Sequence, residues 1–349
     1  MALAKVFQKY FSNIFISIVQ QGKEWIVYSK IMKNGVLKEK LSKNFEIKEN
    51  DKIPIKMQEY LDSLQLQYNF AYLALLLESM GQGAINGTTA VDFEKNSVDM
   101  KSVTHIDIDK KWSIYASFID INWAKKLFSK TGIDFIYSPF IVQYALIKKE
   151  KLKEKPVLYI LNQEDSVVIT VFENKNLLFG AYFKTTTDDS ISTESDEDWE
   201  NVEEEEGIEN ITELDNMTED DMSGVDDLED LNELDDMTSS DEVTSFEDVS
   251  EQEHDLGHFD TGEDEQSSDL ELYGRDILIY KYLTSSIKEF YSNTLYKTVF
   301  IDTIVIYDGY EVSSELIGMI EDELLMDIEM NKINISEIVC NIAREEALK

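Results

Sequence analysis

The residues of this chain that could perform acid–base, nucleophilic or metal chemistry are few and lie far apart. Adjacent carboxylates occur in the turn NQED (residues 162–165), but neighbouring acids in a turn are usually solvated rather than matched as an acid and a base. The three histidines, His105, His254 and His258, lack the spacing of a metal site, and Cys340 stands in a predicted helix. We therefore predict neither a metal site nor a nucleophile–base pair.

Two glycine-containing stretches could approach a phosphate. The first, MGQGAING (residues 80–87), has neither the G-x-G-x-x-G spacing of a dinucleotide site nor the glycine–lysine spacing of a P-loop, so we expect an ordinary loop. The second is Gly22-Lys23, between two strand-like runs. Its meaning depends on the fold that surrounds it.

The negative charge of the chain belongs to one segment. The formal net charge is -39, but 37 of the 71 acidic residues lie between positions 185 and 274, where there is no lysine or arginine. The remainder holds 34 acidic and 32 basic residues, which excludes a basic nucleic-acid footprint. High charge and few aromatic residues predict that 185–274 is disordered.

Within this acidic segment, residues 211–237 alternate acids with apolar residues at intervals of three to five. That pattern is compatible with a helix that folds on a basic partner, and equally with a passive solubilising loop. The single cysteine suits a reducing cytoplasm, and no apolar run reaches the roughly 18 residues of a membrane span. We expect a cytoplasmic chain that meets the membrane only through partners.

Two similar three-strand blocks predict a duplicated fold. Residues 14–41 contain three strand-like runs around a QQGKE turn and an Asn34-Gly35 turn, and residues 158–183 repeat this layout. A shift of 142 positions places Ile18 on Ile160 and continues in constant register. Each block is followed by alternating helical and strand-like patterns, which is typical of an α/β architecture.

The remaining elements follow from periodicity and capping residues. Asp120 is expected to begin a helix that ends near Gly132, and Ser138-Pro139 is expected to begin another. Further elements are predicted as a helix over 54–64, strands over 70–78, 112–119 and 133–138, and, after the acidic segment, helices over 276–293, 313–325 and 335–345 with a strand over 301–309. The predicted division is a first half (1–150), a second half (151–184 and 275–349) and an acidic disordered insertion (185–274).

This order resembles the actin-like (ribonuclease H-like) fold, in which two duplicated α/β halves enclose a nucleotide cleft. Four stretches resemble PilM and the cytoplasmic part of GspL, actin-like components of type IV pilus and type II secretion assembly platforms. They are WSIYASFIDINWAKKLFSKTGIDFIYSPFIVQYAL, KPVLYILNQEDSVVITVFENKNLLFGAYF, LIYKYLTSSIKEFY and IDTIVIYDGYEVSSELIGMIEDELLMDI. With the N-terminal block they cover most of the chain outside the acidic segment. Because no transmembrane helix is predicted, PilM is the closer analogue.

The resemblance implies a cleft formed by three turns, all of which depart from the family pattern. The first turn has no carboxylate, the second has Asn where the family has Asp before Gly, and Tyr310 replaces a glycine in the third. Mg²⁺ needs carboxylate oxygens, and two extra acids in the second turn would repel a triphosphate. The residues of this degenerate cleft are Gly22, Lys23, Asn162, Gln163, Asp308 and Gly309. We expect NQED to be a solvated turn, and neither ATP nor Mg²⁺ to be a cofactor.

The predicted function is therefore a scaffold without ATPase activity. The resemblance implies a cytoplasmic actin-like protein that binds the cytoplasmic tail of an inner-membrane platform protein, and with it a motor ATPase, in a type IV pilus, type II secretion or DNA-uptake (natural transformation) machine. Family members that bind nucleotide carry an extra small subdomain over the base, and this chain has only the acidic segment and one helix in that interval. Two alternatives stay open: a nucleotide-binding actin-like ATPase or kinase-type enzyme, and an interaction protein whose function is the acidic segment.

Overall fold

Three β-sheets position the residues discussed below. The computed structural model describes residues 11–48, 52–150, 155–185 and 263–349. Most of the predicted acidic insertion, including the alternating acidic and apolar stretch, His254 and His258, lies outside the described residues. In the described part of the chain, no helix is long and apolar enough to cross a membrane.

The first sheet has the strand order β3-β2-β1-β4-β8. Strands β1 to β3 form an antiparallel meander, to which β4 and then β8 add in parallel. The bounds are β1 (Ser12–Gln21), β2 (Glu24–Lys33), β3 (Val36–Glu46), β4 (Phe70–Leu76) and β8 (Phe135–Tyr137). Strands β1 and β4 are largely apolar because helices cover the faces of this mixed sheet.

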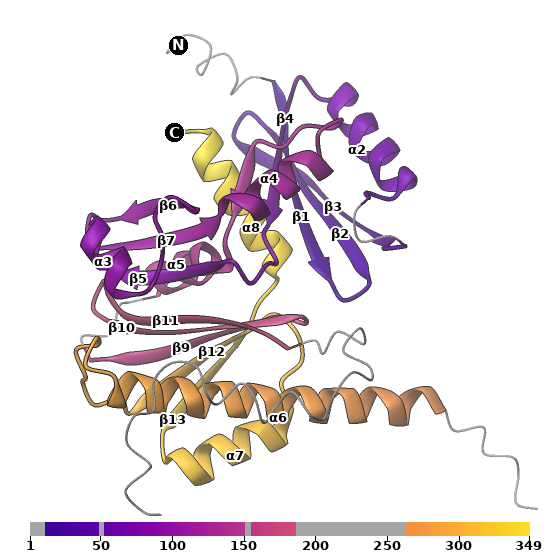
Figure 1. Cartoon of the computed structure of the whole chain (residues 1–349). Coiled ribbons are helices and arrows are strands. Elements are labelled where there is room, and N and C mark those ends of the chain that lie inside the picture. The colour runs from indigo at the N-terminus through magenta and orange to yellow at the C-terminus, as the bar shows by residue number, and fades with distance from the viewer. Residues whose placement is uncertain (1–10, 49–51, 151–154, 186–262) are drawn as a thin grey trace, which may run out of the picture. The chain divides into compact units, whose positions relative to one another are not determined.

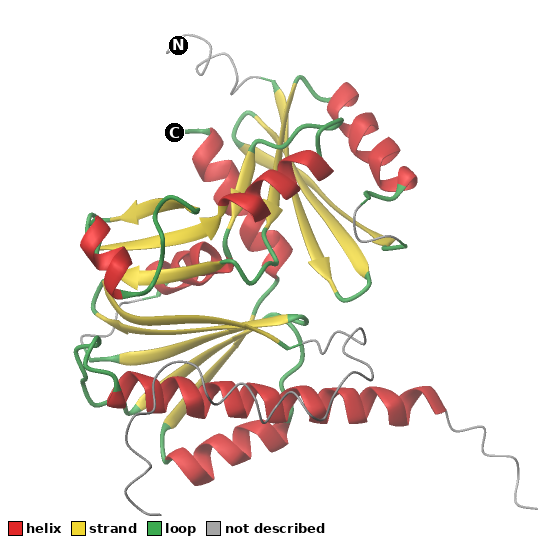
Figure 2. Cartoon of the chain, in the orientation of Figure 1, coloured by secondary structure: helices red, strands yellow, loops and turns green. Residues whose placement is uncertain are grey.

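The second sheet repeats the first, in the order β11-β10-β9-β12-β13. Ile18 pairs with Val27 in the first meander and Ile160 pairs with Ile169 in the second, so the shift of 142 positions preserves the strand register. The bounds are β9 (Val157–Asn162), β10 (Ser166–Glu173), β11 (Asn176–Lys184), β12 (Thr303–Asp308) and β13 (Asp327–Lys332). The predicted duplication is confirmed: the chain has an α/β actin-like fold with two mixed sheets (Figure 2).

A small third sheet, in the order β5-β7-β6, shows that the glycine-rich stretch is not a loop. Its strands are β5 (Gln82–Asn86), β6 (Val103–Ile108) and β7 (Trp112–Ser117), with the short helix α3 (Ala90–Lys95) after β5. The loop prediction was wrong because Gly83 serves packing. A Cβ there would lie 2.4 Å from the Tyr115 hydroxyl of the paired strand β7.

Two helix starts differ from the sequence prediction. Helix α4 (Phe118–Leu127) is capped by Ser117, whose Oγ accepts the Ile119 N–H at 3.1 Å, so Asp120 lies inside the first turn. Helix α6 (Glu263–Ser292) begins inside the acidic segment rather than at residue 276, in keeping with the high helix propensity of Glu, Gln and Leu.

The other helices begin close to their predicted positions. Ser138 caps α5 with Pro139 in its first turn, as predicted. The bounds are α2 (Ile55–Gln67), α5 (Pro139–Lys149), α7 (Ser314–Leu324) and α8 (Ile335–Ala347).

The C-terminal helix α8 packs against the first sheet, although it follows the last strand of the second sheet (Figure 1). Ser17 Oγ donates to the Ser336 carbonyl at 2.7 Å, and the buried Lys30 ammonium forms an ion pair with Glu337 at 2.7 Å. Cys340 is buried in this helix, with Sγ 3.2 Å from the Phe15 carbonyl oxygen. Helix α8 therefore ties the two duplicated halves together.

Candidate functional site

The first and second turns of the predicted cleft touch each other directly. The Gly22 N–H in the β1–β2 turn donates to Asp165 Oδ2 at 2.7 Å. A Cβ on Gly22, which has φ of 52°, would lie 2.4 Å from Glu164 Oε1. The Lys23 side chain is exposed. The glycine of the first turn is thus required by the acids of the second.

Arg275 of α6 inserts into the second turn from the other side. Its Nη2 donates to the Asn162 side-chain oxygen and to the Gln163 carbonyl, and its Nε donates to the Glu164 carbonyl at 2.9 Å. Its Nη1 donates to the Glu311 carbonyl at 3.3 Å. A guanidinium has five N–H donors, so four of them are used within the protein. Arg275 is buried and is therefore an internal anchor of the turn.

The third turn completes the cluster. The Asn162 amide donates to Asp308 Oδ1 at 3.0 Å, and the Gly309 N–H donates to the Asn162 carbonyl at 2.9 Å. A Cβ on Gly309 would lie 2.3 Å from Ile335 Cδ1 of α8, so this glycine accommodates helix packing. The Tyr310 ring lies 4.9 Å from the Arg275 guanidinium, an arrangement suited to a cation–π contact.

The structure brings five of the six predicted cleft residues together and leaves out the Lys23 side chain. Burial raises the pKa of Glu164, Asp165 and Asp308, and the Arg275 charge opposes that rise. Asn162, Gln163 and Asp165 are buried, so the prediction that NQED is a solvated turn was wrong. The turn is buried because its acids and carbonyls bind Gly22 and Arg275.

Glu78, just after β4, links the two halves at the same place. Its Oε2 accepts hydrogen bonds from Ser166 Oγ at 2.9 Å and from the Tyr182 hydroxyl at 2.8 Å, and its Oε1 accepts one from the Gln163 amide. Burial raises the pKa of Glu78 to about 7, although these three donors and Lys184 pull it down. This carboxyl group changes charge near neutral pH.

Sequence reasoning missed Arg275, Glu78 and the role of Asp165. Arg275 is the first lysine or arginine after Lys184, and Glu78 is the first charged residue after the apolar run 70–77, so each differs in type from the residues before it. Neither signal reveals the partner, because the contacts of Glu78 with Ser166 and of Arg275 with Glu164 join residues more than 80 positions apart. The arrangement provides internal hydrogen bonds and charge compensation among the three turns.

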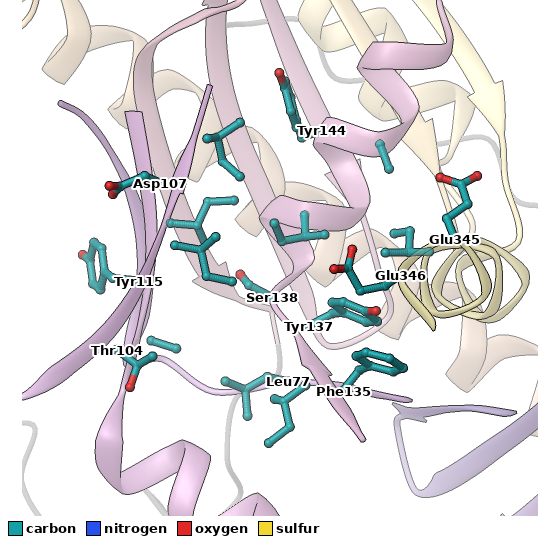
Figure 3. A pocket seen from close by; sticks show the side chains of 18 of the residues that line it. Leu77, Thr104, Asp107, Tyr115, Phe135, Tyr137, Ser138, Tyr144, Glu345 and Glu346 are labelled. Carbon is teal, nitrogen blue, oxygen red and sulfur yellow. The ribbon is translucent and has the colours of Figure 1, made fainter. Parts of the chain in front are cut away.

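An open groove lies elsewhere, between the small third sheet, β8, α5 and α8 (Figure 3). It encloses about 870 Å³. Its apolar lining includes Leu77, Ile106, Ile114, Phe135, Ile141 and Ile342. Within the described residues β8 pairs with β4 alone and ends the first sheet, and Phe135, Ile136 and Tyr137 of β8 line the groove.

The groove also has polar lining residues, which include Tyr137 of β8 and Glu346 of α8. The Tyr137 hydroxyl is buried and forms no hydrogen bond with a described residue. Figure 3 shows Tyr137 close to Glu346 of α8, and Glu346 also pairs with Lys349 at 2.8 Å. Burial raises the pKa of Tyr137 above its usual value, so the hydroxyl stays protonated and can donate. An edge strand beside apolar walls suits an extended peptide.

Solved structures with related folds match most of the chain at low identity. A PilM–PilN type IV pilus biogenesis complex matches with TM-score 0.49 and 10% identity over 97% of this chain and 98% of that one. A Bacteroides thetaiotaomicron protein with actin-like ATPase fold and unknown function gives 0.43 and 9%, over 98% and 97%. The ethanolamine utilization protein EutJ from Carboxydothermus hydrogenoformans gives 0.38 and 8%, over 95% and 88%. These likenesses concern the fold alone.

Comparison of the sequence with protein families separates the two halves. Among curated proteins none matches the sequence. Residues 11–144 match the family described as Domain of unknown function (DUF8569), and residues 158–348 match Domain of unknown function (DUF8341). The second match covers more than half of the chain, which therefore belongs to the DUF8341 family.

Proposed function

We propose that this chain is a non-catalytic actin-like docking protein of an inner-membrane assembly platform. It binds the cytoplasmic tail of a membrane partner as an extended segment in the groove beside β8. The kind of machine, a type IV pilus, type II secretion or DNA-uptake apparatus with a motor ATPase, comes from the sequence resemblance described above.

The observation that carries this proposal is the contrast between the two sites. In the cleft, Gly22, Asn162, Asp165 and Asp308 take their hydrogen bonds from one another and from Arg275. In the groove, the apolar walls and the edge strand β8 are not covered by any described element. Such a surface suits the docking of an extended segment.

An ATPase or kinase-type enzyme is the alternative on the same fold. Phosphoryl transfer depends on positioned cations and on space for the phosphates. Here the acids of the second turn lie against Gly22, and the buried cation of this cleft, Arg275, already binds four oxygen atoms of the protein. ATP binding would require Arg275 to leave these partners, which disfavours a catalytic role.

The test is a crosslinked pull-down from native membranes with wild type and Ile106→Glu. Ile106 lines the groove and is 55% exposed, so the substitution places a charge in the groove without opening the core. We expect wild type to recover a single-span inner-membrane protein and Ile106→Glu to recover about tenfold less, because burying an unpaired charge is costly.

Ile55→Glu is the matched control, since Ile55 is an exposed isoleucine on α2 and does not line the groove. It should recover the partner like wild type. Equal recovery by Ile106→Glu would remove the groove from the proposal. Recovery of soluble metabolic proteins alone would remove the assembly platform as well.

A further inference from the structure

The outer face of α4 carries apolar side chains that no described element covers. Ile119 is 79% exposed, Phe118 44% and Trp123 39%. Met80 is also exposed, and its loop adjoins the helix start because the Ser117 N–H donates to the Gly81 carbonyl at 2.6 Å. The opposite face, with Ala124 and Phe128, packs into the core of the first half. The exposed apolar side chains therefore do not contribute to the packing of this core.

Lysines continue the same face toward the end of the helix. Ile119, Trp123 and Lys126 follow one another at helical spacing, with Lys125 beside them and Lys130 after the cap. All three lysines are exposed, and none forms an ion pair with a residue in the described ranges.

A fourth exposed lysine, Lys101, stands next to Ser102, whose carbonyl accepts the Phe118 N–H at 3.0 Å. The two acidic side chains near these lysines, Asp120 and Asp99, contact residues close to them in the structure. Asp120 lies against Gly81, where a Cβ would be 2.4 Å from its Oδ2, and Asp99 accepts the Lys101 N–H at 2.9 Å. The surface is therefore aromatic and aliphatic at one end and basic around it.

We infer that this α4 surface (Met80, Lys101, Phe118, Ile119, Trp123, Lys125, Lys126 and Lys130) binds an anionic membrane surface directly. Tryptophan and phenylalanine favour the interfacial region of a bilayer, and lysines beside them attract anionic headgroups. Charge complementarity favours a lipid surface over a neutral apolar partner. This departs from the sequence expectation, in which the chain meets the membrane only through partners.

The position of the surface fits the groove. Ile121 of α4 lines one end of the groove, and α4 follows directly from β7, a strand of its wall (Figure 1). A tail that emerges from a bilayer could enter the groove while α4 rests on the same bilayer. The lipid contact itself does not depend on the groove or on the proposed function.

The test is co-sedimentation of the full chain with vesicles. We expect binding to vesicles that contain phosphatidylglycerol, weakened by salt, and little binding to phosphatidylcholine alone. The double variant Ile119→Ser/Trp123→Ser should lose at least tenfold in affinity. Lys125→Gln/Lys126→Gln should lose about fivefold for each lysine removed.

Ile55→Ser/Leu66→Ser and Lys38→Gln/Lys56→Gln are the matched controls, because these side chains are exposed on other elements. They should bind like wild type, and so should the groove variant Ile106→Glu. No binding to anionic vesicles, equal binding to neutral vesicles, or unchanged binding of the Ile119/Trp123 variant would overturn the inference. Because the vesicles contain no protein, failure here leaves the groove proposal standing.

Discussion

At the residue scale, Arg275 holds the cleft closed. It binds three successive residues of the second turn, and it supplies positive charge beside carboxyl groups whose pKa values burial raises. An interaction of this kind is costly to break, because each partner is left buried and unsatisfied.

We predict that Arg275→Met lowers the free energy of unfolding by about 3 kcal/mol, as expected for the loss of one partner of a buried charged network. Urea unfolding measures it. Lys281→Met, an exposed lysine on the same helix, is the control and should change stability by less than about 0.5 kcal/mol. If the two variants were equally stable, Arg275 would not anchor the turn.

A second prediction concerns the effect of Glu78 on the pH dependence of stability. Its pKa is raised to about 7 in the folded chain and is near 4.5 when unfolded. The folded state then holds a proton that the unfolded state has lost, so this contribution to stability is complete below about pH 4.5 and disappears as the pH rises through 7. Glu78→Gln removes this titration.

The Tm of Glu78→Gln relative to wild type should therefore be higher at pH 8 than at pH 5. Glu59→Gln, on the exposed side of α2, should show no such difference between the two pH values. A Glu78→Gln difference that is the same at both pH values would contradict the raised pKa.

At the element scale, α8 connects the halves through Lys30 and Glu337. Lys30 and Lys40 hold the pKa of Glu337 down to about 2, so its contribution is present above about pH 4.5 and is lost as the pH falls through 2. We predict that Glu337→Gln costs about 1–3 kcal/mol at pH 7, because the buried Lys30 loses its counter-charge.

That cost should be smaller at pH 3, because Glu337 in the unfolded chain, with its ordinary pKa near 4.5, already holds a proton there. Chemical unfolding at the two pH values checks it, with Glu321→Gln on the exposed side of α7 as the control. A cost that does not shrink at pH 3 would mean that Glu337 acts by packing rather than by charge.

Much of the fold could be predicted because residue patterns within short stretches of sequence determine many of its strands, turns and helix starts. The alternation of residues 14–41, the Asn34-Gly35 turn and the Ser138-Pro139 helix start each report on their own neighbourhood. The strand at 82–86 was not predicted because its Gly83 is needed for packing against Tyr115, a residue of another strand.

The candidate sites depend on contacts that the sequence pattern does not encode. The resemblance to a known fold predicted that the three turns of the cleft lie near one another. It did not predict which side chains fill the space between them. Arg275 reaches the turn at 162–165 from a different element, and the groove arises only where β8, α5 and α8 meet the third sheet.

At the scale of the whole molecule, both flanks of the acidic segment are attached to the second turn. Thr185, its first residue, donates through its N–H to the Asp165 carbonyl at 3.0 Å and through its hydroxyl to the Glu164 carbonyl at 2.9 Å. Arg275, after it, binds the same turn. Both flanks are therefore held by contacts within the described residues.

Replacing residues 188–262 with about 20 Gly/Ser residues, which span roughly 25 Å, should accordingly change the free energy of unfolding by less than about 1 kcal/mol. Urea unfolding checks this. In the pull-down, the variant should keep the membrane partner and lose any basic soluble partner. If it lost every partner, the third reading of the sequence, an interaction protein that acts through its acidic segment, would replace the docking proposal.

The central claim is that the chain's own side chains occupy the place of a nucleotide. Isothermal titration calorimetry of the purified chain with ATP and Mg²⁺ tests it most directly. Titration to about 5 mM ligand would reveal binding as weak as a Kd of about 1 mM. The closed cleft predicts no saturable heat, with or without Mg²⁺. Saturable, Mg²⁺-dependent binding would contradict it and restore the nucleotide-binding alternative.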